Sequence, residues 1–117
     1  MEKFKELRVW QKAKDLAVEV YQLTNNTEAI STDFRLKSQM CATAVSIASN
    51  IAEGDELSSN KQSNRHFYIA KGSCAELITQ IIIAKEIEYL LEEIADNLIN
   101  KCQHLSSMLY KLIKARE

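Results

Sequence analysis

Three polar side chains line one side of an apolar, small-residue segment at residues 44–54. Ser46, Asn50 and Glu53 are spaced i, i+4 and i+7, so in a helix they share one face. A hydroxyl, an amide and a carboxylate beside a buried face must find hydrogen-bond partners, in this chain or in another copy of it. Ser46 has no histidine at helical spacing to act as a general base. The row therefore predicts a structural network and no nucleophile.

A second polar row follows later in the chain. Ser73, Glu76 and Gln80 share a helical face, and Gly72 removes a side chain beside them. A glycine inside a helix costs about 1 kcal/mol relative to alanine, which favours close approach of another backbone at this position. We expect the two rows to bond across the seam between their helices or to meet a neighbouring subunit. The alternative is that both rows face water.

The histidines and cysteines do not follow a known metal-binding pattern. Di-iron bundles use Glu-x-x-His pairs, but Ser63 and Lys101 stand three residues before His66 and His104. Cys102 and His104 are two residues apart, so on a helix they point roughly 200° away from each other. We expect no metal and no cofactor.

Catalytic machinery is not expected either. Two glycines are too few for a phosphate-binding loop, and no nucleophile motif is present. His66 is expected to be a surface histidine, although packing could bring it near the first row. The sequence therefore predicts no catalytic residue and no enzyme.

The three cysteines, Cys41, Cys74 and Cys102, fall at apolar helical positions, as free thiols in a reducing cytoplasm do. A metal or redox role for them is the less favoured alternative. The charged start of the chain argues against a signal peptide. No apolar run approaches the roughly 20 residues of a membrane span. We expect a cytoplasmic protein without a membrane partner.

The composition predicts an all-α fold. The chain has 117 residues, of which 46% are hydrophobic, with two glycines and no proline. This length fits one domain, residues 1–117, and the absence of proline allows long helices. We expect an antiparallel up-down-up-down four-helix bundle, because short connections join neighbouring helices.

Apolar residues at three- and four-residue steps mark four helices. The first spans about residues 4–23 and ends in the polar segment 24–27. The second begins near Ser31 or Thr32, with Asp33 in its first turn, and is closed by Gly54 in a left-handed conformation. A short connection over residues 55–59 with a serine cap leads to the third helix, at about residues 59–87.

The last boundary carries no glycine or side-chain cap. A turn near residues 88–90 would place Glu92, Glu93 and Asp96 in the first turn of a fourth helix, where acidic side chains favour the helix dipole. The alternative is one continuous helix over residues 59–115. Such a helix would be about 85 Å long and could not pack on itself, so the turn is favoured.

Charge argues against nucleic-acid binding by a single subunit. The formal net charge is −1, with 15 basic and 16 acidic side chains. Nucleic-acid binders usually carry a basic stripe, because phosphate contacts supply most of their affinity. The strongest local excess is near the start of the chain and comprises Lys3, Lys5, Arg8, Lys12 and Lys14. Only an assembly that repeats this patch would present a larger basic surface.

Three separated motifs carry a family resemblance: residues 4–13 (FKELRVWQKA), residues 46–54 (SIASNIAEG) and residues 67–77 (FYIAKGSCAEL). On these motifs the chain resembles the bacterial four-helix-bundle family of 23S rRNA intervening-sequence proteins. The resemblance implies an antiparallel bundle that assembles into a homopentameric ring. A similar bundle is an accessory subunit of diversity-generating retroelements, in which a basic surface engages nucleic acid.

Two positions depart from the family pattern. Cys41 and Ala42 stand where the family often has two arginines, which would remove phosphate contacts if those arginines make them. Glu88 stands where the family tends to have a glycine, before Tyr89 and Leu90. The second departure concerns the geometry of the last turn and leaves the bundle intact.

The favoured function is that of a non-enzymatic, oligomeric scaffold or accessory protein. The structural residues would be Ser46, Asn50, Glu53, Gly54, Gly72, Ser73 and Glu76, and Glu53→Ala is expected to weaken assembly or stability. The alternative is RNA or DNA binding by the assembled ring, through the basic residues from Lys3 to Lys14 and through Lys111, Lys114 and Arg116.

Overall fold

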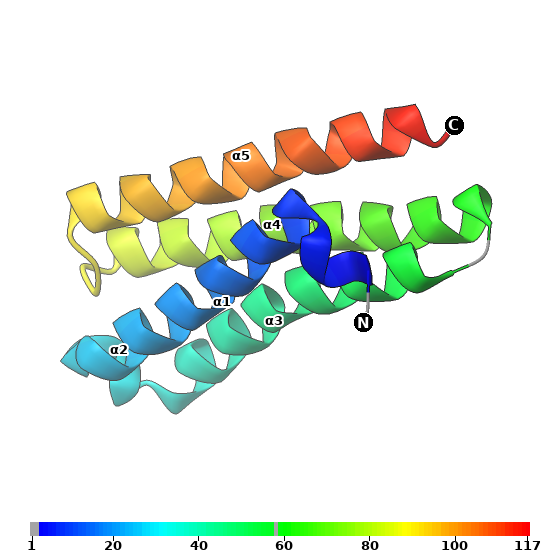
Figure 1. The fold of residues 1–117 in the computed structure, drawn as a ribbon. Coiled ribbons are helices and arrows are strands. Elements are labelled where there is room, and N and C mark those ends of the chain that lie inside the picture. Colours follow the sequence, from blue (N-terminus) through cyan, green and yellow to red (C-terminus); the bar gives the residue numbers. More distant parts are fainter. Residues whose placement is uncertain (1–2, 58) are drawn as a thin grey trace.

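Four long helices form an antiparallel bundle in a computed structural model that describes residues 3–57 and 59–117 (Figure 1). The elements are η1 (Lys3–Glu6), α1 (Arg8–Asn26), α2 (Glu28–Ser31), α3 (Phe34–Glu56), α4 (Asn60–Glu86) and α5 (Glu92–Ala115). The described residues contain no strand. The predicted all-α four-helix bundle is therefore confirmed.

The helices α3 and α4 form the centre of the packing. α1 packs against α3, α3 against α4 and α4 against α5, whereas α1 and α5 touch much less. The molecule measures 43 × 25 × 20 Å, and η1 lies toward the same end of the bundle as the end of α5 (Figure 1). The core contains the predicted stripes of α3 and α4, which are Met40, Ala44, Ile47, Ile51, Phe67, Ala70, Cys74, Leu77, Ile81 and Ala84. Burial of these stripes is the main force that holds the bundle together.

The first helix continues further than its sequence suggested. α1 includes Thr24 to Asn26, so only Thr27 interrupts the helix before the short α2. Thr24 is fully buried, and its hydroxyl donates to the Val20 carbonyl oxygen at 2.9 Å. Because this bond satisfies the hydroxyl within the helix, a threonine that favours turns is accommodated in the interior.

Asp33 lies just outside the helix in whose first turn it was expected. It is the N-cap of α3, and its carboxylate accepts a hydrogen bond from the Leu36 amide at 3.1 Å. The third predicted helix has the predicted serine cap, since Ser59 accepts from the Gln62 amide at 3.2 Å. Of the expected connection over residues 55–59, Asp55 and Glu56 are still helical, and Ser58 lies outside the described residues.

The predicted role of Gly54 as a left-handed helix end was wrong. α3 continues to Glu56, and no glycine in the chain has a positive φ. A Cβ atom at Gly54 would lie 2.7 Å from Cε1 of Phe67 and 3.0 Å from the Ser63 carbonyl oxygen. Gly54 therefore allows α3 and α4 to approach closely.

Close approach was predicted at the other glycine, Gly72, and within this chain that prediction was also wrong. A Cβ atom at Gly72 would meet nothing within 4 Å, and the residue is exposed on α4. The sequence identified a glycine needed for close helix packing but assigned the role to the wrong residue. The packing of the Phe67 ring against Gly54, which is a tertiary contact, determines which glycine has this role.

The turn between α4 and α5 is confirmed, and the continuous helix is excluded. Glu88 adopts a positive φ of 67°, and the Tyr89 amide donates back to the Ala84 carbonyl oxygen at 2.8 Å. Glu92 and Glu93 occupy the first turn of α5, as predicted. Asp96 lies beyond that turn and faces Lys85 at 3.8 Å.

By length and composition alone, α4 could cross a membrane. In the bundle its apolar stripe is buried against the other helices, and Ser63, Ser73 and Gln80 on the same helix are buried as well. This is the pattern of a central helix in a compact helical protein.

Candidate functional site

The two polar rows meet across the seam between α3 and α4. The hydroxyl oxygens of Ser46 and Ser73 lie 3.1 Å apart. The side-chain Nδ2 of Asn50 donates to the Ser46 carbonyl oxygen at 2.9 Å and to the Ser46 hydroxyl at 3.2 Å. We call Ser46, Asn50, Glu53, His66 and Ser73 the polar seam. Of the alternatives left open by the sequence, bonding across the seam within one chain is the one observed.

His66 belongs to this network and is not the isolated surface histidine that was expected. Its Nδ1 lies 3.1 Å from Oδ1 of Asn50 and 3.3 Å from Oε2 of Glu53. Because Nδ2 of Asn50 donates to Ser46, its Oδ1 must face His66, and both atoms facing Nδ1 are hydrogen-bond acceptors. Nδ1 therefore carries a proton. The sequence predicted the serines, Asn50 and Glu53 of the polar seam. It did not predict His66, because no spacing rule connects residues 50 and 66.

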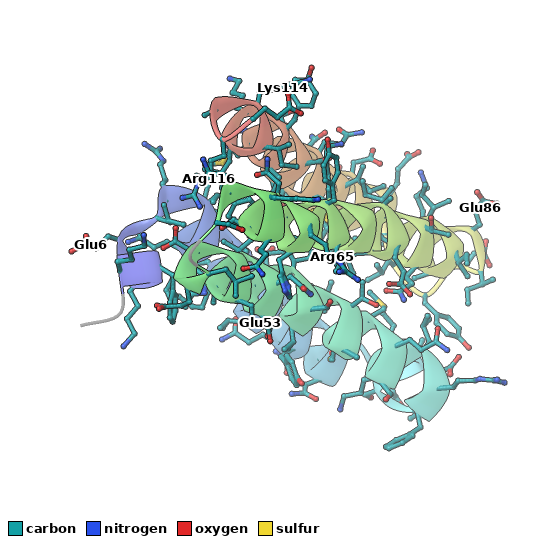
Figure 2. The ribbon with its side chains drawn as sticks, turned by 90° about the vertical axis from the view of Figure 1, so that its right-hand side faces the viewer. Glu6, Glu53, Arg65, Glu86, Lys114 and Arg116 are labelled. Carbon is teal, nitrogen blue, oxygen red and sulfur yellow. The ribbon has the colours of Figure 1, made fainter. Side chains whose placement is uncertain are left out.

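Glu53 occupies the outer edge of the seam. Its side chain is 64% exposed, whereas that of His66 is 29% exposed. Figure 2 shows Glu53 on α3 and Arg65 on α4 on the face where the two helices meet. Water competes for the hydrogen bonds of an exposed carboxylate and screens its charge, so Glu53 contributes less than the buried carboxylate that the sequence suggested.

The second row divides between the interior and the surface. Gln80 donates to the Thr43 hydroxyl at 3.0 Å, and Thr43 donates to the Gln39 carbonyl oxygen at 2.8 Å. Oε1 of Gln80 is buried without a hydrogen-bond partner among the described residues. Glu76 is exposed, and no ion pair or hydrogen bond joins it to another described residue. Ser73 thus belongs to the seam, and Glu76 faces outward.

The geometry of the polar seam fits a structural role. The hydroxyl of Ser46 contacts Ser73 and Asn50, and the Nδ1 atom of His66 faces Asn50 and Glu53. No general base therefore contacts either serine hydroxyl within the seam. What the arrangement can do is fix the register of α3 against α4, because one shift along either helix breaks several bonds at once.

A charged contact at the end of the bundle was missed by the sequence. Arg116 donates to Oδ1 of Asp55 at 2.9 Å, and its guanidinium carbon lies 5.1 Å from the centre of the Phe67 ring. The Asp55 side chain is only 2% exposed. Arg116 is therefore held in a structural contact, which counts against its expected role in binding nucleic acid.

The basic residues near the start of the chain are only partly available. Lys3, Lys5 and Arg8 are exposed on η1 and at the start of α1, and Lys12 is half-buried. Lys14 pairs with Asp15 at 2.6 Å. A bond from the Gln11 side chain to the Lys5 carbonyl oxygen, 2.8 Å long, holds η1 against α1.

At the other end of the chain, Lys114 pairs with Glu117 at 3.4 Å and lies 5.6 Å from the centre of the Tyr110 ring, while Lys111 is exposed. Because η1 and the start of α1 lie toward the same end of the bundle as the end of α5, the two basic segments share that end (Figure 1). This proximity was not predictable from spacing in the sequence.

All three cysteines are free and buried. Burial raises the pKa of the Cys74 thiol to about 11 and that of Cys102 to about 12. Cys41 lies 3.5 Å from the Thr24 hydroxyl. The described residues contain no group of three or more His, Cys, Asp or Glu side chains that could hold a metal ion. These thiols are packing groups, since neutral buried thiols are poor nucleophiles and poor ligands.

Comparison with known proteins gives a family and a fold. A crystal structure of a protein of unknown function from the S23 ribosomal protein family of Bacteroides thetaiotaomicron superposes with a TM-score of 0.85 at 22% sequence identity. The match covers 91% of this chain and 98% of that one. No curated protein sequence matches the chain. The sequence model of the 23S rRNA-intervening sequence proteins matches residues 5–111, so the chain belongs to that family.

Proposed function

We propose that this protein is a non-enzymatic, homo-oligomeric helical bundle that acts as a scaffold or accessory subunit. The observation that carries the proposal is the apolar surface that the bundle leaves uncovered. Large apolar side chains are exposed on α1, α3 and α4, including Val18, Tyr21, Val45, Ile69, Ile83 and Ile87. Exposed apolar surface that gathers along helix faces marks interaction sites in soluble proteins.

The internal organisation of the bundle supports a structural role. The polar seam and the Asp55–Arg116 pair use their polar groups to hold helices together, not to present them to a ligand. The buried free cysteines are compatible with a reducing cytoplasm, which we propose as the location. The homopentamer implied by the family resemblance is the assembly we propose.

The native mass of the purified protein tests this proposal. The measurement is native mass spectrometry on protein prepared without nuclease, with light scattering as a second method. A mass near five times 13.3 kDa supports the proposed ring. A mass of one subunit would overturn the oligomeric scaffold.

A second candidate function is RNA or DNA binding by the assembled ring. The observation in its favour is that η1 and the start of α1, which carry the exposed Lys3, Lys5 and Arg8, lie toward the same end of the bundle as the last turns of α5, which carry the exposed Lys111 (Figure 1). Repetition of this patch around a ring would multiply a modest affinity through effective concentration. The near-neutral charge and the engagement of Arg116 with Asp55 place this function second.

The same preparation separates the two functions. Absorbance at 260 nm in excess of the protein contribution, lost on nuclease treatment, would support nucleic-acid binding. An affinity for RNA or DNA that falls steeply with salt is expected if phosphates are bound. If the protein is oligomeric and shows neither effect, nucleic-acid binding is excluded and the scaffold function remains.

A further inference from the structure

One apolar surface lies between α1 and α3. A groove there is formed by Ala17, Val18 and Tyr21 of α1 and by Val45 and Ala48 of α3. Val18 is 48% exposed, Tyr21 46% and Val45 40%, so each of these large apolar residues is partly exposed to solvent. The groove extends toward the start of α3, where Tyr21 also faces Phe34, Lys37, Ser38, Cys41 and Ala42. We call this surface the α1–α3 groove.

A second apolar surface runs along α4. Ile69 and Ile83 of α4 and its C-cap residue Ile87 are 46%, 47% and 48% exposed, and their spacing places them on one side of the helix and its end. Gly72 and Glu76 lie between Ile69 and Ile83 on this side, and Glu86 adjoins Ile87. We call this set the α4 stripe. Gly72 leaves open space on it, so another chain could approach the backbone there.

The groove and the stripe carry opposite charges at the same level of the bundle. Lys37 lines the groove one turn into α3, and the α4 stripe ends at Glu86. The level is set by contacts between α3 and the end of α4: Tyr89 donates to Oδ2 of Asp33 at 3.3 Å, and Gln80 donates to Thr43 at 3.0 Å. In the chain, Lys37 lies between the N-cap Asp33 and Thr43 of α3, and Glu86 at the end of α4 lies between Gln80 and Tyr89 of the following turn.

Lys37 and Glu86 have no oppositely charged partner among the residues that the structure describes. Figure 2 shows Glu86 projecting from the far end of α4, away from Arg116. If a second copy lies beside the first in the same orientation, Glu86 of one copy stands opposite Lys37 of the next.

We infer that the α1–α3 groove receives the α4 stripe of a second copy of this chain, with Lys37 and Glu86 paired across the contact. This inference rests on the proposed homo-oligomer and specifies its interface. The two surfaces are different and lie on either side of α3, so each copy offers a groove to one neighbour and a stripe to the other. Such a head-to-tail contact closes into a ring when the rotation between copies permits.

A charge exchange tests the pairing. Lys37→Glu and Glu86→Lys each place like charges in contact, and we expect each to raise the dissociation constant of the assembly about tenfold or more. The double variant restores an opposite pair and should recover most of the lost affinity. Lys61→Glu makes the same charge change on an exposed residue in the first turn of α4 and serves as the control.

An apolar variant tests the groove itself. Val45→Glu places a carboxylate in the groove at a position that is 40% exposed, so the bundle should fold while the assembly dissociates. Circular dichroism and the thermal midpoint verify the fold, and native mass spectrometry over a dilution series measures the assembly. Val18→Glu changes the facing wall and should act in the same direction.

The outcomes separate the two proposals. A wild-type mass of one subunit overturns the oligomer and the interface with it. An oligomeric wild type whose assembly is unchanged by Val45→Glu and by both charge reversals overturns the interface alone. Dissociation by the single charge reversals without recovery in the double variant overturns the Lys37–Glu86 pairing.

Discussion

The carboxylate of Asp55 and the guanidinium of Arg116 form an ion pair 2.9 Å long that joins the end of α3 to the end of α5. These residues are 61 positions apart in the chain. The Asp55 side chain is 2% exposed and that of Arg116 is 23% exposed, so the pair is largely shielded from water. Arg116 also covers the Phe67 ring at 5.1 Å. The contact therefore holds the end of α3 to the end of α5.

Loss of Arg116 should therefore destabilise the bundle. Arg116→Ala leaves a buried carboxylate without its partner, and Oδ2 of Asp55 already has none among the described residues. We expect a loss of about 2–4 kcal/mol in the free energy of unfolding, measured by urea denaturation. Arg116→Lys keeps the charge but loses the planar contact with Phe67 and should fall in between. Lys111→Ala, at an exposed position of α5, is the control and should change little.

The two glycines should respond to alanine in opposite directions. At Gly54 a new Cβ would press on the Phe67 ring and the Ser63 carbonyl oxygen, at 2.7 and 3.0 Å, so Gly54→Ala should cost about 1–3 kcal/mol. At Gly72 it would meet nothing within 4 Å, so Gly72→Ala should stabilise the isolated bundle by about 0.5–1 kcal/mol. Thermal midpoints of the two variants under identical conditions give the comparison. Equal shifts of the same sign would contradict the assigned roles.

Replacing Glu88 with glycine should stabilise the folded protein. Its φ of 67° lies in the left-handed region, where a residue with a Cβ is strained. Glu88→Gly removes that strain but gives the unfolded chain more conformational entropy, which offsets part of the gain. The free energy of unfolding should therefore rise by up to about 1 kcal/mol. Glu88→Ala keeps the Cβ and controls for the lost charge. If alanine matched glycine, relief of backbone strain would not be the cause.

The polar seam should depend more on Asn50 than on Glu53. Asn50 bonds to both Ser46 and His66, so Asn50→Ala leaves two half-buried groups unsatisfied and should cost about 1–2 kcal/mol. Glu53 is 64% exposed, so Glu53→Ala should cost less than about 1 kcal/mol. Urea denaturation of both variants decides the order. A larger loss for Glu53 would show that assembly or a partner buries it.

Alkaline pH should weaken the fold through the buried cysteines. Burial raises the pKa of Cys74 from its ordinary value of 9.0 to about 11, so the folded protein binds more protons than the unfolded chain between those values. Stability is therefore retained below pH 9 and lost as the pH rises toward 11. Cys74→Ala should show a shallower loss of the thermal midpoint over this range. Alkylation at neutral pH should label the thiols only after unfolding.

The helical class, the buried apolar positions and most of the helix boundaries follow from local patterns in the sequence. The buried apolar positions of α4 from Phe67 to Ala84 follow the helical period, and a period is a local property that needs no tertiary information. The Ser59 cap and the turn at Glu88 were also predicted, because cap and dipole preferences act within one turn of the chain. The limits of local reasoning show at Thr24, where a polar residue typical of turns is satisfied inside the helix.

Which polar groups contact one another depends on how the helices pack. The Asn50–His66 and Asp55–Arg116 contacts join residues on different helices, and their formation depends on how those helices cross. The same dependence assigned close helix packing to Gly54 instead of Gly72, because a Cβ at Gly54 would meet the Phe67 ring, whereas a Cβ at Gly72 would meet no described atom within 4 Å. Side-chain type and spacing fix the face on which a residue lies, whereas the packing of helices decides what that face touches.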